Sequence, residues 1–600
     1  LGQRGEFNFL IMGHLRDGVN LAAARERVAA AVAPLEAQYP ETRRPFTGAL
    51  LMERDSRPEP AMAGQMQLAF KLFLLVGGGV LLIACANVAS LLLARAIARR
   101  REITVRLALG ASRGRLIRQL ITESLVLALL GGGLGGFVAM WMTAGFSGLL
   151  HFATDIPFVF DFSPDIRVFW FTAGVTLTAV LAFGLVPALQ ASSPSLQGTL
   201  RGDPPRGARS TRAFAVLVAA QVALSCLLLV GAGLVVRSLQ VTARVSPGFE
   251  TRQRLLVSVA PGLVGYDDAR STRLFRQLQA ELAGLPGIAG VTLVDEAPLD
   301  FTSNSGQMVA DGVERRGAVL EAIGLTEIGA DYFRVMGMPL LSGREFGPGD
   351  TAGAPRVAIV SQRMAEAFWP GGSPLGRVIR FDGADGDPIT VVGVAADAKY
   401  RNLTESTPSH AYFPVDQDPP RTVTFILATG PDPIAAVESV RRTIAAADPD
   451  LPIAAVRTYE ELIAGRALLL NSLAARVTAF MGLLALALAL IGLYGVVAYR
   501  AAQRRRELGI RLALGATNGT VVRLVLRDGC RLAGWGIASG LVGAVLVTRL
   551  ARALLFGVSP TDPVVLTSVI LLLILVTLGA SWIPARRAGQ FDPVTILRGD

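Results

Sequence analysis

One segment of this sequence occurs twice, and each copy directly follows a long apolar run. Residues 101–111 (REITVRLALGA) recur as 506–516 (RELGIRLALGA), with 8 of 11 positions identical at a constant spacing of 405 residues. A second, shorter repeat follows each copy: Pro187-Ala188 and Leu200–Asp203 recur as Pro584-Ala585 and Leu597–Asp600. A repeat of this period indicates that two similar halves of one membrane protein were fused in tandem.

The apolar runs predict a helical membrane protein. Hydrophobic residues make up 52% of the 600-residue chain, and the mean hydropathy is +0.47. A helix needs about 20 apolar residues to cross a bilayer. Seven runs meet this requirement, at about 70–96, 119–148, 167–189, 213–237, 475–500, 521–553 and 564–584. One long polar region, about 240–468, is large enough to fold as a domain with its own core.

The positive charges predict the orientation of these spans. The net charge is +11, and nearly all of the cations are arginines. They gather at 99–118, 190–212, 500–527 and 586–598, whereas the short loops 151–166 and 556–563 contain no Lys or Arg. The positive-inside rule therefore places the Arg-rich loops in the cytoplasm, and 1–65 and 240–468 on the opposite side. Because no basic stripe interleaved with aromatic residues occurs, we do not expect nucleic-acid binding.

The motifs of common enzyme sites are missing from the sequence. A phosphate-binding Walker A loop needs Gly-Lys-Ser/Thr, but Leu72 follows Lys71 and Tyr400 follows Lys399. Neither HExxH nor GxSxG occurs. The three histidines and the three cysteines are scattered along the chain, at His14, His151, His410, Cys85, Cys226 and Cys530. We therefore predict no enzyme activity, and no catalytic, cofactor-binding or metal-binding residues.

The repeated segment has the features of a short helix. Glu102 and Arg106 are four residues apart, as are Glu507 and Arg511, and this order of charges stabilises a helix. The glycine near the end of each copy would terminate it. Arginines beside spans often serve only topology and contact with anionic lipids. Here the identity extends through Leu-Ala-Leu-Gly-Ala, which a charge rule does not require, so we expect a helical elbow at the cytoplasmic face.

The polar region 240–468 alternates helical and strand-like patterns. It predicts helices over Tyr266–Ala283 and Ile434–Ala446, and strands over Ile288–Val294, Val357–Val360 and Ile389–Val394. An α+β domain inserted between two spans is the expected fold. The lone His410 is interpreted as a surface or hydrogen-bonding residue and not as a ligand.

Polar residues and glycines inside the predicted spans have two interpretations each. Glu123 and Asp528 are 405 residues apart, and pairing with the nearby Arg118, Arg523 or Arg527 is favoured over proton coupling. Asn87 and Gln221 are interpreted as hydrogen-bond partners between helices and not as substrate ligands. The pairs Gly132 with Gly136 and Gly536 with Gly540 are interpreted as close helix contacts within the bundle.

Residues 7–40 resemble a weak echo of 425–450, with a strand at Phe7–Met12 and a helix at Leu21–Gln38. We expect that a further helix and most of a first external domain precede Leu1. The expected organisation has six parts: 1–65, the end of a first periplasmic domain; 66–200, a first transmembrane unit of three spans; 201–212, a cytoplasmic linker; 213–239, the first span of the second unit; 240–468, a periplasmic domain; and 469–600, three further spans.

Several blocks of residues together resemble one family. Arg100–Ser112, followed by Leu116–Leu125, resembles the membrane core of ABC transporter permeases of the MacB/FtsX type. Asp331–Leu340, Gly343–Phe346 and Val357–Gly376 resemble the periplasmic domain of that family. The duplicated layout is similar to that of the duplicated permeases first described in acidobacteria. The resemblance implies two FtsX-like units of about seven spans here, an inserted MacB-like periplasmic domain, and a location in the bacterial cytoplasmic (inner) membrane.

The resemblance also implies a permease subunit that works with a separate ATPase and couples ATP hydrolysis to periplasmic movement, for export or efflux. The docking loops would be about 99–115 and 504–520, and Asn518 and Thr520 in the second replace Arg113 and Arg115 in the first. Carried over by position, the docking residues are Glu102, Arg106, Leu107, Gly110, Ala111, Glu507, Arg511, Leu512, Gly515 and Ala516. The partners would be this ATPase, the lipid bilayer, and a periplasmic adaptor or other periplasmic protein. The alternative is a regulator that transports nothing and moves a periplasmic partner such as a cell-wall hydrolase.

Overall fold

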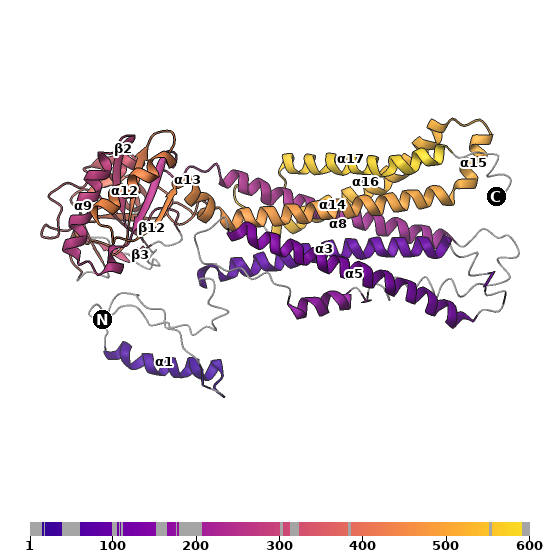
Figure 1. Ribbon diagram of the computed structural model, residues 1–600, viewed down its shortest axis with the longest axis horizontal. Coiled ribbons are helices and arrows are strands. Elements are labelled where there is room, and N and C mark those ends of the chain that lie inside the picture. Colours follow the sequence, from indigo (N-terminus) through magenta and orange to yellow (C-terminus); the bar gives the residue numbers. More distant parts are fainter. Residues whose placement is uncertain are drawn as a thin grey trace. The chain divides into compact units, whose positions relative to one another are not determined.

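The computed structural model describes the chain in two compact units (Figure 1). One comprises Leu1–Met66 and Thr242–Leu470, and the other comprises Gln67–Val241 and Asn471–Asp600. We call residues 242–470 the α/β unit and the second set the membrane unit. The described residues are 15–16, 18–38, 60–98, 105–106, 109, 112–151, 165–175, 177–178, 207–300, 304–311, 323–381, 386–550, 552 and 555–590. Near the N-terminus they include the helix α1 (Leu21–Gln38), which confirms the predicted helix, while the predicted strand before it lies outside them.

The first part of the α/β unit consists of two β-α-β segments that share one sheet. Their strands have the antiparallel order β12-β1-β11-β2. The elements are β1 (Arg254–Val259), η1 (Pro261–Val264), α9 (Asp268–Ala283), β2 (Ile288–Val294), β11 (Val423–Thr429), η2 (Ile434–Ala436), α12 (Val437–Ala447) and β12 (Ile453–Thr458). The helices and the strand predicted for this part are confirmed. Asp267 caps α9, because its side chain accepts a hydrogen bond from the backbone N–H of Arg270.

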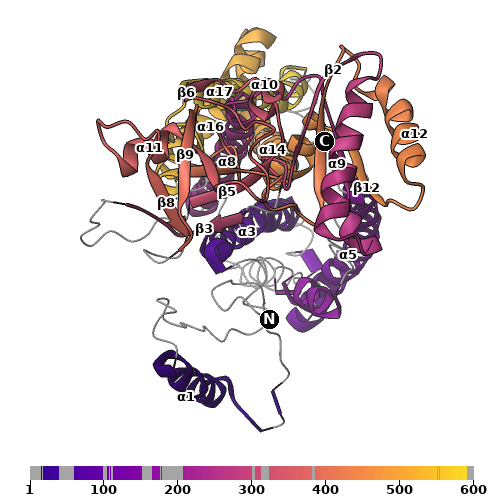
Figure 2. The same ribbon diagram turned by 90° about the vertical axis from the view of Figure 1, so that its left-hand side faces the viewer.

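Alternation along the strands decides which face of this sheet the helices cover. Leu255 and Val257 pack in a cluster with residues of α9 and α12, whereas Leu256, between them, belongs to a cluster on the other face. Successive side chains of a strand point to opposite faces, so both faces of β1 are buried. Figure 2 shows α9 and α12 side by side next to β12, where the two helices contact each other.

Residues 295–422 form the second part of the unit and extend the same sheet in the order β5-β10-β7-β9-β8-β4. In addition, β3 pairs with β5 and β6 pairs with β9. The elements are β3 (Asn304–Gly306), β4 (Met308–Ala310), β5 (Ile323–Ile328), α10 (Tyr332–Met336), β6 (Leu340–Gly343), β7 (Val357–Ser361), α11 (Gln362–Phe368), β8 (Val378–Phe381), β9 (Ile389–Ala395) and β10 (His410–Pro414). The strands predicted at 357–360 and 389–394 are confirmed as β7 and β9.

His410 lies in the core of this second part, so its interpretation as a surface residue is wrong and the hydrogen-bonding alternative is right. Its ring stacks on Tyr400 with 3.6 Å between centroids, and its Nε2 lies 2.8 Å from the Thr326 hydroxyl. Burial lowers the pKa of His410 to about 3, because a charged imidazolium loses its hydration there. The residue is therefore neutral and structural.

The α/β unit ends in a short helical segment that leads into a membrane helix. Thr458 forms a capping box with Glu461 at the start of α13 (Tyr459–Leu462). One π-helical turn, η3 (Ile463–Ala467), follows, and α14 begins at Leu469. The Asp300 carboxylate pairs with Arg457 of β12 at 2.9 Å and with Arg466 of η3 at 2.6 Å. These two ion pairs fix the end of the unit to the loop after β2.

The membrane unit has 6 helices that are long and apolar enough to cross a membrane among the described residues. They lie within α3 (Pro60–Ala98), α5 (Arg113–His151), α8 (Gly207–Thr242), α14 (Leu469–Gln503), α16 (Asn518–Leu550) and α17 (Pro563–Gly589). These confirm six of the seven predicted spans. Of the remaining one, 167–189, the structure describes an apolar helix over Ile166–Val175 and residues 177–178 only.

The interpretation of the glycine pairs is confirmed in the second half of the chain. A Cβ on Gly536 would lie 2.8 Å from the Ala219 carbonyl oxygen of α8, and one on Gly540 would lie 2.6 Å from that of Ala223. Only glycine allows α16 to approach α8 this closely. At Gly132 and Gly136 a Cβ would meet no described atom within 4 Å, so for this pair the interpretation stays a prediction.

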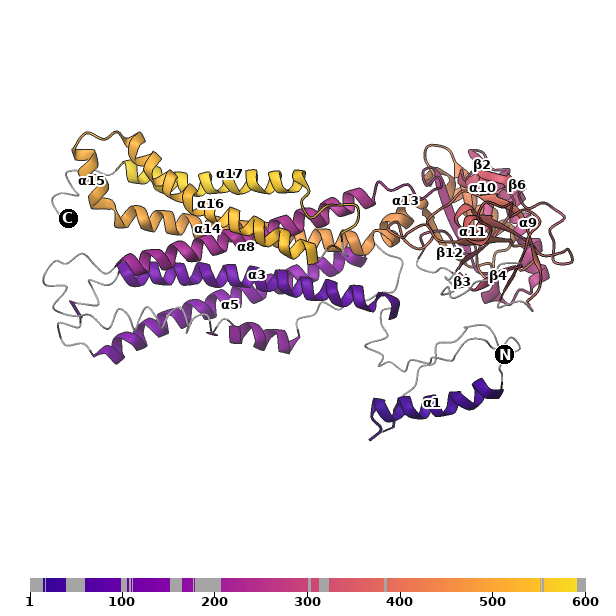
Figure 3. The same ribbon diagram turned by 180° about the vertical axis from the view of Figure 1, so that it is seen from behind.

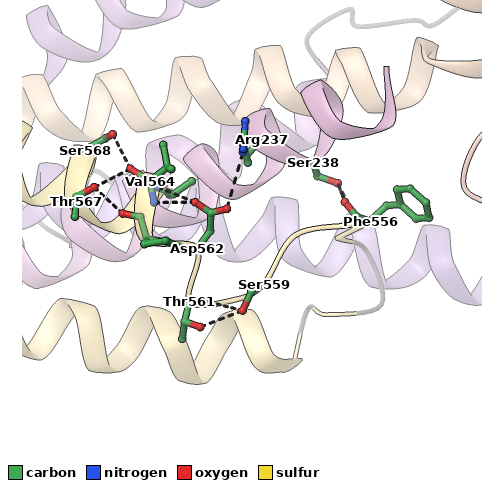
Figure 4. A network of polar contacts seen from close by, with 11 residues as sticks. Arg237, Ser238, Phe556, Ser559, Thr561, Asp562, Val564, Thr567 and Ser568 are labelled. Atoms are coloured by element: carbon green, nitrogen blue, oxygen red, sulfur yellow. Dashed lines mark hydrogen bonds and ion pairs between the residues drawn. The ribbon is translucent and has the colours of Figure 1, made fainter. Parts of the chain in front are cut away.

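A polar network fastens one end of α8 to the loop between α16 and α17 (Figure 4). The Ser238 hydroxyl accepts from the Phe556 N–H at 2.9 Å, and the Arg237 Nε lies 3.9 Å from an Asp562 carboxylate oxygen. The Asp562 side chain also accepts from the N–H groups of Val564 and Val565, the second and third residues of α17. Asp562 therefore caps α17 and contacts α8 at the same time.

Candidate functional site

The candidate site is the elbow helix α15 (Arg505–Ala513), which connects α14 to α16 (Figure 3). Only one residue, Arg504, separates it from α14. The sequence predicts a helix at this place, and the structure confirms it for the second copy of the repeat. Of the first copy, the structure describes residues 105–106 and 109, and α5 begins at Arg113.

Glycine terminates α15 as the sequence predicts. Gly515 has φ +95°, a conformation that residues with a Cβ rarely adopt. Its N–H bonds to the Leu512 carbonyl at 3.1 Å, and the Ala516 N–H bonds to the Arg511 carbonyl at 2.9 Å. This pair of bonds is the Schellman arrangement, which satisfies the last carbonyls of a helix. The chain then turns at Thr517, whose side chain accepts from the Thr520 N–H and so caps α16.

Charged residues connect α15 to the two neighbouring helices. Arg511 and Glu507 form the expected pair at 2.7 Å, and Glu507 also lies 3.9 Å from Arg504. Arg504 in turn pairs with Asp528 of α16 at 2.7 Å. The prediction that Asp528 forms an ion pair is confirmed, but its nearby partners Arg523 and Arg527 were the wrong choice. Arg504 reaches Asp528 because α15 folds back toward α16.

One face of α15 is anchored in the membrane unit. Leu508 is 1% exposed and belongs to a cluster with residues of α8, α14, α16 and α17. Leu512, one turn later, is half-buried against the same cluster. Because residues four apart share a face of a helix, Leu508 and Leu512 fix the rotation of α15 about its axis. The face that α15 presents to solvent follows from this anchor.

The opposite face of α15 exposes two apolar side chains. Ile510 is 42% exposed, and Leu514, just after the helix, is 82% exposed. Their equivalents in the first copy behave alike, since Val105 is 51% and Leu109 is 82% exposed. These four residues are missing from the docking residues predicted from the sequence. The signal was that both positions are apolar in the two copies, but the sequence does not indicate which apolar positions lie inside.

The docking residues predicted from the sequence have different places in the structure. Glu507, Arg511 and Gly515 shape α15, while Leu512 anchors it. Ala516 contributes the last hydrogen bond of the turn. In the first copy only Arg106 is among the described residues, and its guanidinium donates to Gln119 of α5 at 3.4 Å. Glu102, Leu107, Gly110 and Ala111 lie outside them.

The two copies connect the elbow to the next helix through equivalent acids. In the first copy Gln119 also donates to Glu123 at 3.2 Å, so the connection runs from Arg106 through Gln119 to Glu123. In the second copy Asp528, at the position equivalent to Glu123, accepts from Arg504 at 2.7 Å. In both copies, therefore, the acid 17 residues after the elbow arginine accepts a hydrogen bond from a residue beside the elbow, Gln119 in the first and Arg504 in the second.

The arrangement of the site suits contact with another protein. No group of three or more His, Cys, Asp or Glu within the described ranges is placed to hold a metal ion. The cavity beneath α15, between Arg500, Leu508, Val525 and Gly529, has a volume of about 20 Å³, which is room for a single water molecule. Exposed apolar side chains on a rigid helix, by contrast, are typical of surfaces that another protein covers.

Family models match most of the chain. The model described as FtsX-like permease C-terminal matches residues 74–196 and again 479–593. The two matches begin 405 residues apart, which is the spacing of the repeated segment. The model described as MacB-like periplasmic core domain matches residues 215–447, and so covers most of α8 and most of the α/β unit.

Curated relatives of the chain are named as ABC transporter permeases or as export ATP-binding/permease proteins. The chain is 26% identical over 334 residues to the uncharacterized ABC transporter permease YknZ of Bacillus subtilis, covering 53% of this chain and 78% of that protein. It is 24% identical over 390 residues to the macrolide export ATP-binding/permease protein MacB of Bartonella henselae, covering 60% of this chain and 55% of that protein. It thus spans about half the length of that MacB relative.

Among solved structures, the periplasmic region of MacB from Actinobacillus actinomycetemcomitans is similar at 19% identity, with a TM-score of 0.24, covering 35% of this chain and 90% of that one. The two FtsX-like matches together with the match to one periplasmic core domain identify the family. The chain belongs to the ABC transporter permeases of the MacB/FtsX type, with two FtsX-like segments flanking a MacB-like periplasmic core domain.

Proposed function

We propose that this multi-pass membrane protein is the permease subunit of an export or efflux system, and that its two elbows dock on a separate ABC ATPase. The observation that supports the docking is the equal exposure of Leu109 and Leu514, at 82% each, at equivalent positions of the two halves. Full burial of a leucine side chain contributes about 1.5–3 kcal/mol. Two such contacts, one from each half, suit a partner with two similar subunits.

The charged docking residues act in this proposal by holding the elbow in shape. Arg511 is engaged by Glu507 of the same helix, so its first role is to stiffen α15. Leu514 then carries the contact. Replacing Arg511 by alanine should weaken binding of the ATPase less than replacing Leu514 by glutamate, because the second change puts a charge into the contact itself.

Helix continuity supports mechanical coupling between α15 and the periplasmic domain. One residue separates the single helix α14 from η3, where the periplasmic domain ends, and one residue separates it from α15. An unbroken helix of 35 residues transmits a displacement of its cytoplasmic end along its axis, since its backbone hydrogen bonds resist stretching. ATP-driven movement of the elbow would thereby reach the periplasmic domain.

The test is purification of the full-length chain in nanodiscs, with co-purifying proteins identified by mass spectrometry. The wild type should retain an ATPase with a Walker A loop. The amount of ATPase that co-purifies with the double variant Leu109→Glu/Leu514→Glu should be at least tenfold lower than with the wild type. Each single variant should reduce it by less. Leu263→Glu is the matched control, because Leu263 is 80% exposed in the periplasmic domain.

Two outcomes would contradict the proposal. Retention of the ATPase by the double variant would mean that the elbows are not its docking site. A wild-type preparation that carries a periplasmic protein and no ATPase would favour the alternative, a regulator that transports nothing. In that case transport of a small amphiphile should also be undetectable in cells that overproduce the chain.

A further inference from the structure

The two halves of the membrane unit meet along equivalent helices. α3 of the first half and α14 of the second run alongside each other in Figures 1 and 3 and share one apolar cluster. Three pairs of residues at the 405-residue spacing gather in it: Val76 and Met481, Val80 and Ala485, and Ile83 and Leu488. Equivalent residues meet in this way at a two-fold axis, as in a symmetric dimer. We call this contact the central seam.

The symmetry of the central seam breaks at one position. Asn87 of α3 and Gly492 of α14 are equivalent by the same spacing, yet one is a polar amide and the other has no side chain. The Asn87 amide donates to the Leu488 carbonyl at 2.8 Å. Gln221 of α8 donates to the Asn87 amide oxygen at 2.8 Å and to the same Leu488 carbonyl at 3.0 Å. The expectation that Asn87 and Gln221 connect helices is confirmed, with α14 as the third helix.

Gly492 is the residue that makes room for this polar contact. A Cβ on Gly492 would lie 2.3 Å from the Asn87 amide oxygen and 2.4 Å from the Gln221 amide nitrogen. Both amides are buried, since Asn87 is 6% and Gln221 is 3% exposed. The amide of one half therefore occupies the space that a side chain at the equivalent position of the other half would fill.

We propose that Asn87 and Gly492 form a heterotypic lock, which directs the first half to pair with the second half of the same chain and not with its own copy in another chain. Pairing of α14 with α14 would bring Gly492 against Gly492, and Gln221 would lose the Asn87 oxygen. Pairing of α3 with α3 would set two Asn87 side chains against each other without the gap that Gly492 supplies. A buried polar residue is known to select the partner of a helix in this manner.

The lock has a consequence for the assembly of the protein. A permease built from identical single units must use the same residue on both sides of its two-fold axis. The fused chain is free of this constraint and places different, complementary residues there. One chain then supplies both of the membrane halves that pair. This inference is independent of the ATPase proposal, because none of its residues belongs to the elbows.

Cysteine cross-linking of the full-length chain tests which halves meet. The three native cysteines are first replaced by alanine, and a protease site is introduced in the linker 201–206. Val80→Cys with Ala485→Cys should cross-link within one chain, so that the two fragments stay joined after cleavage. Val80→Cys alone and Ala485→Cys alone should give no product of twice the chain mass. A strong product of that mass from either single variant would overturn the proposal.

Substitutions at the lock test its cause. Gly492→Ala should reduce the in-chain cross-link at least fivefold at a fixed oxidation time. Gly534→Ala is the matched control on a neighbouring membrane helix, since a Cβ there meets no described atom within 4 Å, and its yield should stay within twofold of the parent.

If Gly492→Ala does not accumulate in the membrane, Asn87→Leu replaces it, because leucine keeps the branched outline of asparagine and removes the hydrogen bonds. Asn87→Leu should lower the in-chain yield and allow a product of twice the chain mass from Val80→Cys. Unchanged yields in both lock variants would refute the lock.

Discussion

The ion pairs of Asp300 give the sharpest prediction for the periplasmic domain. Asp300 accepts from Arg457 at 2.9 Å and from Arg466 at 2.6 Å, and the three side chains are only 17%, 13% and 20% exposed. Nearby, the Tyr459 hydroxyl donates to the Pro298 carbonyl at 2.9 Å. Together these contacts hold β12, α13 and η3 to the loop after β2, at the place where the chain leaves the domain.

The perturbation is Asp300→Asn, which keeps the shape of the side chain and removes its charge. Breaking a buried ion pair costs about 3–5 kcal/mol, because it leaves a charge without compensation. The arginines remain partly exposed, and the amide oxygen of asparagine can still accept from them. Both effects reduce this loss, so we expect the free energy of unfolding to fall by about 2–3 kcal/mol. For a domain of this size the melting temperature should fall by roughly 6–9 °C.

Asp331→Asn is the matched control. Asp331 pairs with Arg334 at 3.0 Å, a similar distance, but these side chains are 50% and 60% exposed. Exposed pairs contribute about 0.2–1 kcal/mol, so the control should move the melting temperature by less than about 3 °C. Raising the salt concentration to about 0.5 M should abolish the small shift of Asp331→Asn and leave most of the larger shift of Asp300→Asn, because salt screens exposed charges more than buried ones.

The assay is thermal unfolding of the full chain in nanodiscs, followed by the fluorescence of Trp369. This residue is buried in the periplasmic domain, and the other tryptophans, which lie in the apolar helices, are replaced by phenylalanine. A double-mutant cycle of Asp300→Asn with Arg466→Gln measures the coupling energy between these two side chains, apart from the other effects of each substitution. Equal losses for Asp300→Asn and Asp331→Asn, or a coupling energy below about 0.5 kcal/mol, would refute the reasoning.

Three further predictions concern other contacts. Burial raises the pKa of Asp295 to about 7, so the folded state binds this proton more tightly than the unfolded state, and the stability present at pH 3.8 and below is lost as the pH rises through about 7. Asp295→Asn should therefore raise the melting temperature by roughly 3–6 °C at pH 8 and hardly at pH 4. A larger increase at pH 4 than at pH 8 would contradict this sign. Gly536→Ala should destabilise the membrane unit by about 1–3 kcal/mol in denaturant titrations, because a Cβ collides with α8, whereas Gly534→Ala should not. Asp562→Ala should cost about 1 kcal/mol through the lost cap of α17, measured by faster hydrogen exchange of its first turn, and unchanged exchange would refute this role.

Much of the local structure followed from the sequence, because it depends on residues a few positions apart. The pair of Glu507 with Arg511 and the glycine end of α15 are both fixed by such spacings. The length of an apolar run likewise suffices to identify a span. The repeat revealed the two halves, and the matches of one family model to both of them agree with its spacing.

The central seam, the exposed face of the elbow and the partner of Asp528 were decided only by the tertiary structure. Asn87 and Gly492 are separated by 405 residues, and each alone fits many helix contacts. Leu508 and Leu514 are chemically alike, but the packing of four helices buries the first and leaves the second in solvent. Asp528 pairs with Arg504 since the chain folds back after α14. Spacing along the chain determines which residues share a helix face, whereas the choice of neighbour depends on how whole helices fill space against one another.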